Sequence, residues 1–183
     1  MSWTKHRQHT PPSARIWSRT AARLPAQVAT RLQCVTVVPA SIDETFDFFS
    51  NAANLERLTP PWLHFNIKTP LPIAMGEGVE IDFEIMLRGV AMPWRSRIDI
   101  WEPGRRFVDR QTIGPYRWWR HEHHFEPLDG FTRVTDIVSY VPRFRLVTGP
   151  FVSREVTRIF DYRNYALQSV WNTEPGQLES SQP

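Results

Sequence analysis

A strict alternation of apolar and polar residues constrains the fold of this chain more than any other feature. In "VEIDFEIML" (79–87) every second residue is apolar, and the residues between them are mostly acidic. Side chains two residues apart lie on the same face of a β-strand, so this pattern predicts a strand with one buried face. The same pattern recurs with turn residues between the repeats, which predicts strands at 65–69, 79–87, 92–103, 105–114, 116–127 and 131–142.

Helical signals flank this run of strands. "LQCVTVV" (32–38) predicts a first strand, and Ser41 with Glu44 forms a capping box for a short helix that buries Phe46 and Phe49. A second short helix should follow and end at Pro60. After the last strand, 149–171 has apolar residues at helical spacing, with Arg154, Arg158 and Arg163 assigned to its solvent face. The predicted class is α+β, with a curved antiparallel sheet around a long C-terminal helix and a cavity between them.

The segment "YRWWRHEHHFEP" (116–127) concentrates histidines on one predicted strand. Strand periodicity places His121 and His123 on the face that carries Trp119 and Phe125, and it places His124 on the opposite face. Asp129-Gly130 predicts a two-residue hairpin turn of type I′. Outward from that turn, the predicted pairs are Phe125–Val134, His123–Asp136, His121–Val138 and Trp119–Tyr140. On the other side, a three-residue loop would pair Asp109 with His121 and Gln111 with Trp119.

Three interpretations of the inward histidines remain open. A metal could be held by two His and a carboxylate, but no helical residue completes the ligand set and the spacing is not specific for a metal. A His oriented by an Asp could transfer protons as an acid or base. A buried His–Asp pair could also satisfy its own polar groups and offer one nitrogen to a polar ligand. The third interpretation is preferred, so neither a metal nor another cofactor is expected.

The charge of the chain is divided between its N-terminus and the rest. Six of the 22 Lys and Arg, but none of the 19 Asp and Glu, lie in residues 1–31. The rest is therefore acidic, which argues against a nucleic-acid partner. We expect a disordered basic extension at 1–31, one domain at 32–173 and a flexible tail at 174–183. The sequence has no apolar run long enough to span a membrane, and the single Cys34 is expected to be a buried thiol. A cytoplasmic location is expected.

The quoted stretches also resemble a known family. "VPASIDETFDFFSNAANLERLTPPWLHFNI", "WEPGRRFVDRQTIGPYRWWRHEHHFEP", "TDIVSYVP" and "IFDYR" are similar to the SRPBCC, or START-like, superfamily, and most closely to its bacterial cyclase/dehydrase-like, ligand-binding branch. The resemblance implies a helix-grip fold, with a seven-stranded antiparallel sheet around the C-terminal helix and two short helices after the first strand. Some members of the branch are fused to an epimerase-type oxidoreductase, which makes such an enzyme an alternative partner.

The predicted function is binding of a hydrophobic small molecule such as a lipid, an isoprenoid or a polyketide-like compound. An alternative is a cyclase or dehydratase in which His123, oriented by Asp136, acts as the acid/base. Another is a regulatory partner domain of an epimerase-type oxidoreductase. The predicted ligand-binding residues are Trp94, Phe107, Asp109, Gln111, Trp119, His121, His123, Phe125, Tyr140 and Phe160.

Overall fold

The computed structural model describes residues 18–24, 27–87, 89–143 and 145–172. Within these residues the strands form one antiparallel sheet in the order β1-β2-β8-β7-β6-β5-β4-β3. The strands are β1 (Ser18–Leu24), β2 (Gln27–Val38), β3 (Asn66–Ile67), β4 (Glu80–Leu87), β5 (Val90–Glu102), β6 (Arg106–Ile113), β7 (Tyr116–Leu128) and β8 (Phe131–Pro142).

The helices form where the capping and apolar patterns predict them. They are α1 (Ile42–Ser50), α2 (Leu55–Leu58) and α3 (Arg145–Asn172), with 3₁₀ turns at Ala52–Asn54 and Pro61–Leu63. Ser41 caps α1, because its hydroxyl accepts from the Glu44 backbone N–H while the Glu44 carboxylate accepts from the Ser41 backbone N–H. Phe46 and Phe49 are buried on one face of α1, as their spacing predicts.

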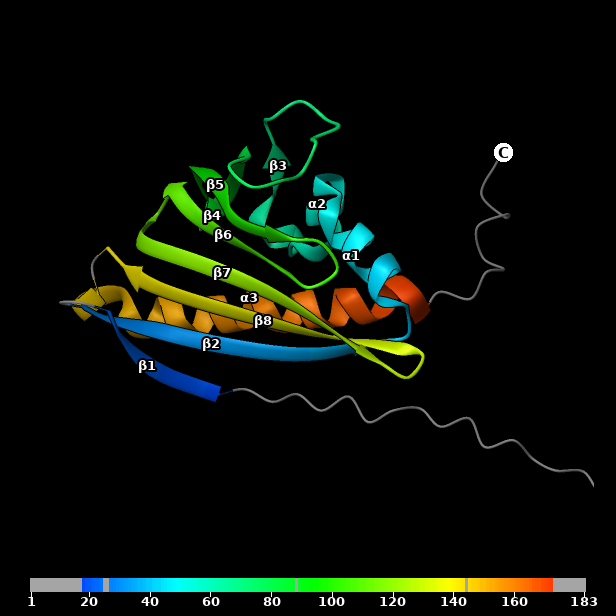
Figure 1. Cartoon of the computed structure of the whole chain (residues 1–183). Helices are drawn as coiled ribbons and strands as arrows, with labels where there is room; N and C mark the ends of the chain where they lie inside the picture. The colour runs from blue at the N-terminus through cyan, green and yellow to red at the C-terminus, as the bar shows by residue number, and fades with distance from the viewer. Residues whose placement is uncertain (1–17, 25–26, 88, 144, 173–183) are drawn as a thin grey trace, which may run out of the picture.

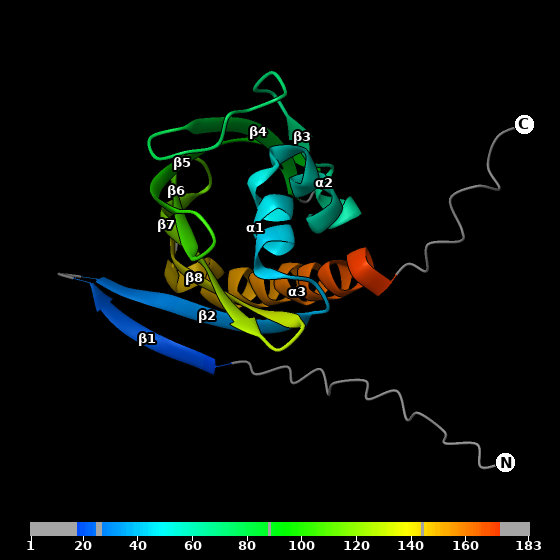
Figure 2. The ribbon, with the colours of Figure 1, turned by 45° about the vertical axis from the view of Figure 1, so that its right-hand side comes forward.

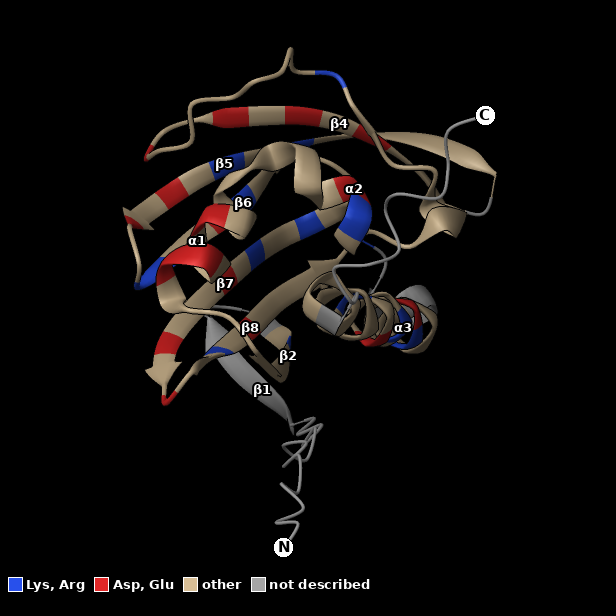
Figure 3. Cartoon of the chain, turned by 90° about the vertical axis from the view of Figure 1, so that its right-hand side faces the viewer, with Lys and Arg blue, Asp and Glu red and all other residues tan. Residues whose placement is uncertain are grey.

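The sheet curves around the long helix, so the helix-grip fold is confirmed. α3 packs mainly against β2 and β8 (Figure 1). The sheet curls away from α3 through β7, β6, β5 and β4, and α1 and α2 lie across its open side (Figure 2). Seen nearly along the axis of α3, the strands arch over the helix (Figure 3). Strands β2–β8 are the seven that were predicted.

The sheet is larger at its N-terminal end than the sequence patterns indicate. β2 begins at Gln27 rather than at residue 32, and β1 pairs with it along its whole length, from Ser18–Gln33 to Leu24–Gln27. β1 is an eighth strand within the described residues, in a segment that was assigned to a disordered extension. Its sequence, "SRTAARL", has no β-branched residue except Thr20, so its propensity gives little indication of a strand. Residues 1–17 and the predicted tail at 174–183 lie outside the described residues.

The β7–β8 hairpin has the predicted register. Leu128 pairs with Phe131 across the Asp129-Gly130 turn, and all four pairs predicted outward from that turn are present. Gly130 has a φ of 70°, in the left-handed region that favours glycine, but Asp129 does not have a positive φ, so the turn is not the type I′ turn that was expected. Asp109 pairs with His121 between β6 and β7, as predicted. The register therefore brings the polar side chains of β6, β7 and β8 side by side on the concave face.

No helix among the described residues is both long and apolar enough to cross a membrane.

The interior holds two apolar clusters on the concave side of the sheet. One surrounds Phe46, Phe49 and Phe125, and the other surrounds Trp94, Trp119 and Phe160. The polar side chains of β6 and β7 lie between the two clusters, because Phe49 contacts His123 and Phe160 contacts His121.

Cys34 is a buried thiol, as predicted, and we expect it to be unreactive. Burial and the nearby Asp136 carboxylate raise its pKa to about 11, and the side-chain N–H of Asn164 donates to Sγ at 3.5 Å. Because the thiolate is the reactive form, a disulfide reagent at pH 8 should label the native protein far more slowly than the denatured protein. Equal labelling rates in the native and denatured states would contradict this burial.

Candidate functional site

A cavity of about 210 Å³ lies between the concave face of the sheet, the α1–α2 segment and α3. Its wall is mostly apolar and aromatic. Seven of the ten predicted ligand-binding residues line it, namely Trp94, Phe107, Asp109, Trp119, His121, His123 and Phe160. The cavity is therefore an apolar chamber with a small group of ionisable residues in its wall, which is the usual character of a small-molecule site.

The other three predicted residues have supporting positions. Phe125 faces inward but packs between Phe46 and Phe49, with ring centroids 5.3 and 5.1 Å away. Tyr140 is fully buried and packs beside Trp119. Gln111 closes the β6–β7 turn: its side-chain N–H donates to the carbonyl of Tyr116, and its side-chain oxygen accepts from the Tyr116 N–H.

These three positions share one physical reason. Strand periodicity identifies the face on which a side chain lies, but it does not show whether a helix or a turn already covers that point of the face. α1 covers Phe125, the turn uses the whole amide of Gln111, and Tyr140 lies beneath neighbouring rings.

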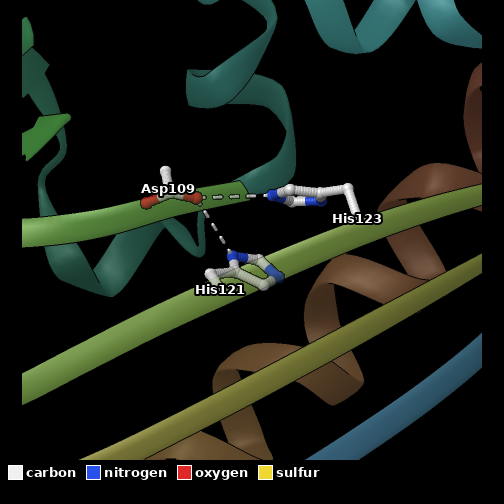
Figure 4. Close-up of side chains that lie close together, drawn as sticks. All are labelled: Asp109, His121 and His123. Carbon is white, nitrogen blue, oxygen red and sulfur yellow. Dashed lines mark ion pairs between the residues drawn. The ribbon is translucent and has the colours of Figure 1, made fainter. Parts of the chain in front are cut away.

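Two histidines and two aspartates form a buried cluster beside the cavity, and we call Asp109, His121, His123 and Asp136 the His–Asp cluster. Asp109 comes from β6, both histidines from β7 and Asp136 from β8. His121 Nε2 is 3.2 Å from Asp136 Oδ1, and its Nδ1 is 3.9 Å from Asp109 Oδ2. Figure 4 shows Asp109 facing both rings.

His123 lies between the same two carboxylates. Its Nδ1 is 2.7 Å from Asp136 Oδ1, and its Nε2 is 3.5 Å from Asp109 Oδ2. The ring stacks on Phe107 with the two ring centroids 4.1 Å apart, and it lies 3.9 Å from the ring of His121. Both nitrogens of His123 are therefore ion-paired, and its faces are covered by rings.

Further side chains hold the two aspartates. The Ser96 hydroxyl donates to Asp109 Oδ1 at 2.9 Å, and the Trp94 indole N–H donates to the Ser96 oxygen at 3.2 Å. On the other side, Arg163 of α3 places Nε 3.5 Å from Asp136 Oδ2. The prediction that Arg163 faces solvent is therefore wrong: it is 9% exposed and lines the cavity. The role of Ser96 was not predicted from the sequence.

Neighbouring groups outweigh the effect of burial on three members of the cluster. Burial opposes ionisation of Asp136, but Arg163 and His123 outweigh it and hold the pKa of Asp136 well below its usual range. Burial is likewise outweighed at Asp109, where His123 and His121 lower the pKa. Burial would lower the pKa of His123, yet Asp136 and Asp109 raise it. The two carboxylates thus face the guanidinium of Arg163 and a histidine, His123, whose pKa they raise.

His121 is the neutral member of the cluster. Burial and the neighbouring charge of His123 lower its pKa to about 4, against the opposing effect of Asp136. Because a carboxylate accepts and does not donate, the proton of neutral His121 lies on Nε2, which donates to Asp136. Its Nδ1 then carries a lone pair. The distance of 3.9 Å from Nδ1 to Asp109 Oδ2 is too long for a hydrogen bond, so Nδ1 is available to a ligand.

This architecture defines a class of fold: the chain has a helix-grip fold, in which a curved antiparallel sheet surrounds a long helix. More particularly, residues 86–171 match the model of a domain of unknown function (DUF8410). This segment includes the complete strands from β5 to β8 and nearly all of α3, so it contains the whole His–Asp cluster.

Solved structures agree with the fold. A protein from Arthrobacter aurescens is 13% identical with a TM-score of 0.63, and the match covers 84% of this chain and 92% of that one. The ZhuI aromatase/cyclase from Streptomyces sp. R1128 is 21% identical with a TM-score of 0.61, covering 78% and 93%. At these identities the similarity establishes the fold, not an activity. A comparison with curated proteins gave no match.

Part of a larger protein is also similar to this chain. The nucleoside-diphosphate sugar epimerase from Corynebacterium glutamicum is 26% identical with a TM-score of 0.57. The match covers 75% of this chain and 28% of that protein. A domain of this fold therefore occupies a minor part of a longer epimerase chain.

Proposed function

We propose that the protein binds a compact, largely apolar small molecule that carries a hydroxyl or another hydrogen-bond donor. The observation that carries the proposal is the aromatic cavity whose wall contains the His–Asp cluster. Its volume of about 210 Å³ lies below the several hundred cubic ångströms of typical drug-sized sites. This size favours a molecule with one or two fused rings, such as a polyketide-like or terpenoid compound, over a lipid with two acyl chains.

The polar groups of the cluster favour a ligand that donates a hydrogen bond over a ligand that only accepts one. His121 Nδ1 offers a lone pair, and Asp109 Oδ2 is a carboxylate oxygen 3.9 Å from it. A ligand hydroxyl beside these two atoms would donate to His121 Nδ1, while Asp109 Oδ2 keeps its contact with His123 Nε2. A ligand carboxylate would instead bring a negative charge beside Asp109 in a site of low polarity, where like charges repel strongly. The cluster should therefore discriminate between neutral alcohols or phenols and organic acids.

Three bicyclic compounds of similar shape test this proposal. We expect 2-naphthol to bind more tightly than naphthalene, and 2-naphthoate to bind at least about tenfold more weakly than 2-naphthol, because one unfavourable charge contact costs more than about 1.4 kcal/mol. Trp94 and Trp119 line the cavity, so quenching of tryptophan fluorescence reports binding, and calorimetry gives the affinities.

Asp109→Asn is the matched variant for this test. It keeps the shape of the side chain but removes the charge, so the penalty against 2-naphthoate should shrink. Equal binding of all three compounds to the unmodified chain would contradict the proposed polar selection. Failure of all three to bind would contradict the proposed apolar ligand itself.

A second candidate function is acid/base catalysis of the cyclase or dehydratase type. The observation that favours it is the neutral His121, whose Nδ1 faces the cavity while Asp136 holds its Nε2. In this candidate the base is His121, whereas the sequence predicted His123. The reason is that both nitrogens of His123 lie against carboxylates. His123 and Asp136 would then orient His121 and balance its charge.

The bicyclic ketone 2-tetralone tests proton transfer directly. Its acidic α-hydrogens exchange with D₂O when a base removes a proton and returns a deuteron, and mass spectrometry measures this exchange. We expect exchange above the buffer rate with the unmodified chain and at the buffer rate with His121→Asn. His124→Asn changes the outward histidine of the same strand and should leave the exchange unchanged. Full activity of His121→Asn, or exchange at the buffer rate with the unmodified chain, would reject this candidate.

The similarity to the epimerase supports an oxidoreductase as the alternative partner. Because the matched portion is 28% of that protein, the remainder of the epimerase is the natural candidate for contact with a domain of this kind. Sedimentation of this chain with the Corynebacterium protein lacking its matched portion tests the association. Separate sedimentation of the two at micromolar concentration would contradict it.

A further inference from the structure

Three metal-ligating atoms of the His–Asp cluster converge at the cavity wall. Asp109 Oδ2 lies 3.9 Å from His121 Nδ1 and 3.5 Å from His123 Nε2, and one ligand atom from each of the three residues lies within 4.8 Å of the others. We propose that Asp109, His121 and His123 bind one divalent first-row transition-metal ion, of the zinc and ferrous iron class. This inference builds on the proposed function in that the ion lies in the wall of the same cavity.

The distances suit an ion at the centre of the group. Zinc binds imidazole nitrogen and carboxylate oxygen at about 2.0–2.2 Å, which in a tetrahedral site separates two ligand atoms by about 3.4 Å. The separations of 3.5 and 3.9 Å from Asp109 Oδ2 are close to that value. Small rotations of the side chains would therefore form the site, without movement of the strands.

The backbone holds the three ligands on adjacent strands. His121 and His123 are two residues apart on β7 and so point to the same face, and Asp109 of β6 pairs directly with His121. The sequence argument disfavoured a metal because no helical residue completed the ligand set. The structure makes a helical ligand unnecessary, since β6 supplies the carboxylate beside both histidines (Figure 4). Ligands on paired strands are held more rigidly than ligands on loops.

Each ligand also has a partner that orients it, as metal ligands usually do. Asp136 Oδ1 contacts the nitrogen of each histidine that is directed away from Asp109, at 3.2 Å for His121 and 2.7 Å for His123. The Ser96 hydroxyl donates to Asp109 Oδ1, which leaves Oδ2 directed at the histidines. Carboxylates behind metal-bound histidines fix the orientation of the rings and raise their basicity.

The composition of the site selects the kind of ion. Two imidazoles and one carboxylate suit zinc and iron, whereas Mg²⁺ and Ca²⁺ prefer ligand sets made of oxygen atoms. All three ligands line the cavity, and Asp136 lies behind the histidines. An ion held on three sides by protein would keep a coordination position toward the cavity. That position would take an oxygen of the bound ligand, such as an alcohol or an enol.

Titration of the complete chain with ZnCl₂, and separately with CoCl₂, tests the site without any organic ligand. We expect one equivalent of Zn²⁺ to bind by calorimetry, Co²⁺ to give the visible absorption of a four- or five-coordinate site, and Mg²⁺ not to compete. Asp109→Asn and His123→Gln should abolish this binding. Asp136→Asn, which changes only an orienting partner, should weaken it about 10–100-fold.

Matched controls distinguish this site from three of the other four histidines of the chain. His124→Gln alters the outward-facing neighbour, and the double variant His6→Gln/His9→Gln alters the N-terminal pair; both should bind Zn²⁺ as the unmodified chain does. Circular dichroism of each variant checks that it is folded. If Asp109→Asn does not fold, the Co²⁺ spectrum of the unmodified chain still reports whether imidazole nitrogens coordinate the ion.

Two results would overturn the proposal. One is the absence of stoichiometric Zn²⁺ binding by the unmodified chain, and the other is binding that is lost in His6→Gln/His9→Gln and retained in Asp109→Asn. Neither result bears on the binding of 2-naphthol, which is measured with no metal present. Failure of 2-naphthol to bind, with the zinc site intact, would in turn reject the proposed ligand but not the metal site.

Discussion

Replacing Asp136 by alanine should lower the free energy of unfolding by about 3–5 kcal/mol, the cost of removing one partner from a buried ion pair. Asp136 is 4% exposed and lies next to His123 and Arg163. Its loss would leave the buried guanidinium of Arg163 without its carboxylate, and it would remove the carboxylate that contacts His123 Nδ1 and His121 Nε2. Urea denaturation followed by tryptophan fluorescence measures the effect.

Asp82→Ala is the control for this substitution, because it also removes an ion-paired aspartate from the sheet. Asp82 pairs with Arg95 at 2.6 Å on the convex face, where the side chains are 42% and 36% exposed. Surface pairs of this kind contribute about 0–1 kcal/mol. Figure 3 shows the acidic positions of β4 along one edge of the curved sheet, with a basic stretch of β5 next to them. Equal destabilisation by the two substitutions would show that burial does not determine how much the cluster contributes to the free energy of unfolding.

Phe49→Ala should destabilise the protein by about 3–5 kcal/mol and enlarge the cavity. The ring of Phe49 is 6% exposed, lines the cavity, and packs against His123 and Phe125. Its removal would leave a void beside the existing chamber. We expect part of the lost stability to return when a ligand with one ring more than 2-naphthol is added, because a molecule that binds the folded state stabilises it.

Phe151→Ala provides the matched control for this change. Phe151 is on α3 and is 65% exposed, so its removal should change the stability by no more than about 0.5 kcal/mol. Thermal melting of both variants, with and without the larger ligand, measures the two effects together. If the larger ligand raised the melting temperatures of both variants equally, the void left by Phe49 would not be the place where it binds.

Much of the His–Asp cluster could be predicted from the sequence because a turn fixed the register of two strands. Asp129-Gly130 permits a two-residue hairpin, and this turn sets the partners of the β7 residues from Trp118 to Leu128. Once His123 faces Asp136, strand periodicity separates His121 and His123 from His124. The same reasoning reached Asp109 across β6, although the longer turn there gave a weaker constraint.

Arg163 was missed because three arginines were treated as one polar stripe on the C-terminal helix. Arg154 and Arg163 are nine residues apart, which at 100° per residue places them about half a turn apart on the helix. Arg154 is exposed, whereas Arg163 is buried at Asp136. Closer attention to helical spacing would have separated these two residues, but their spacing alone could not show that a carboxylate of β8 would lie opposite.

Other features depend on tertiary structure that local patterns do not encode. The inward face of a strand can end in a cavity or beneath a packed helix, and Phe125 and Tyr140 lie in packed regions. β1 has a weak propensity for strand and is in place because β2 offers an unpaired edge. The volume of the cavity depends on how closely α1, α2 and α3 approach the sheet.

The ion pair between Arg163 and Asp136 has a mechanical consequence for the helix. Close packing normally fixes the rotation of a helix on a sheet, and the part of α3 that carries Val152, Ile159 and Arg163 borders the cavity. Arg163 supplies a directional constraint there, since turning α3 by one residue would carry its guanidinium away from Asp136. The ion pair thus fixes the rotation of α3 about its own axis. A ligand that binds to the cluster would therefore also change how firmly α3 is held against the sheet.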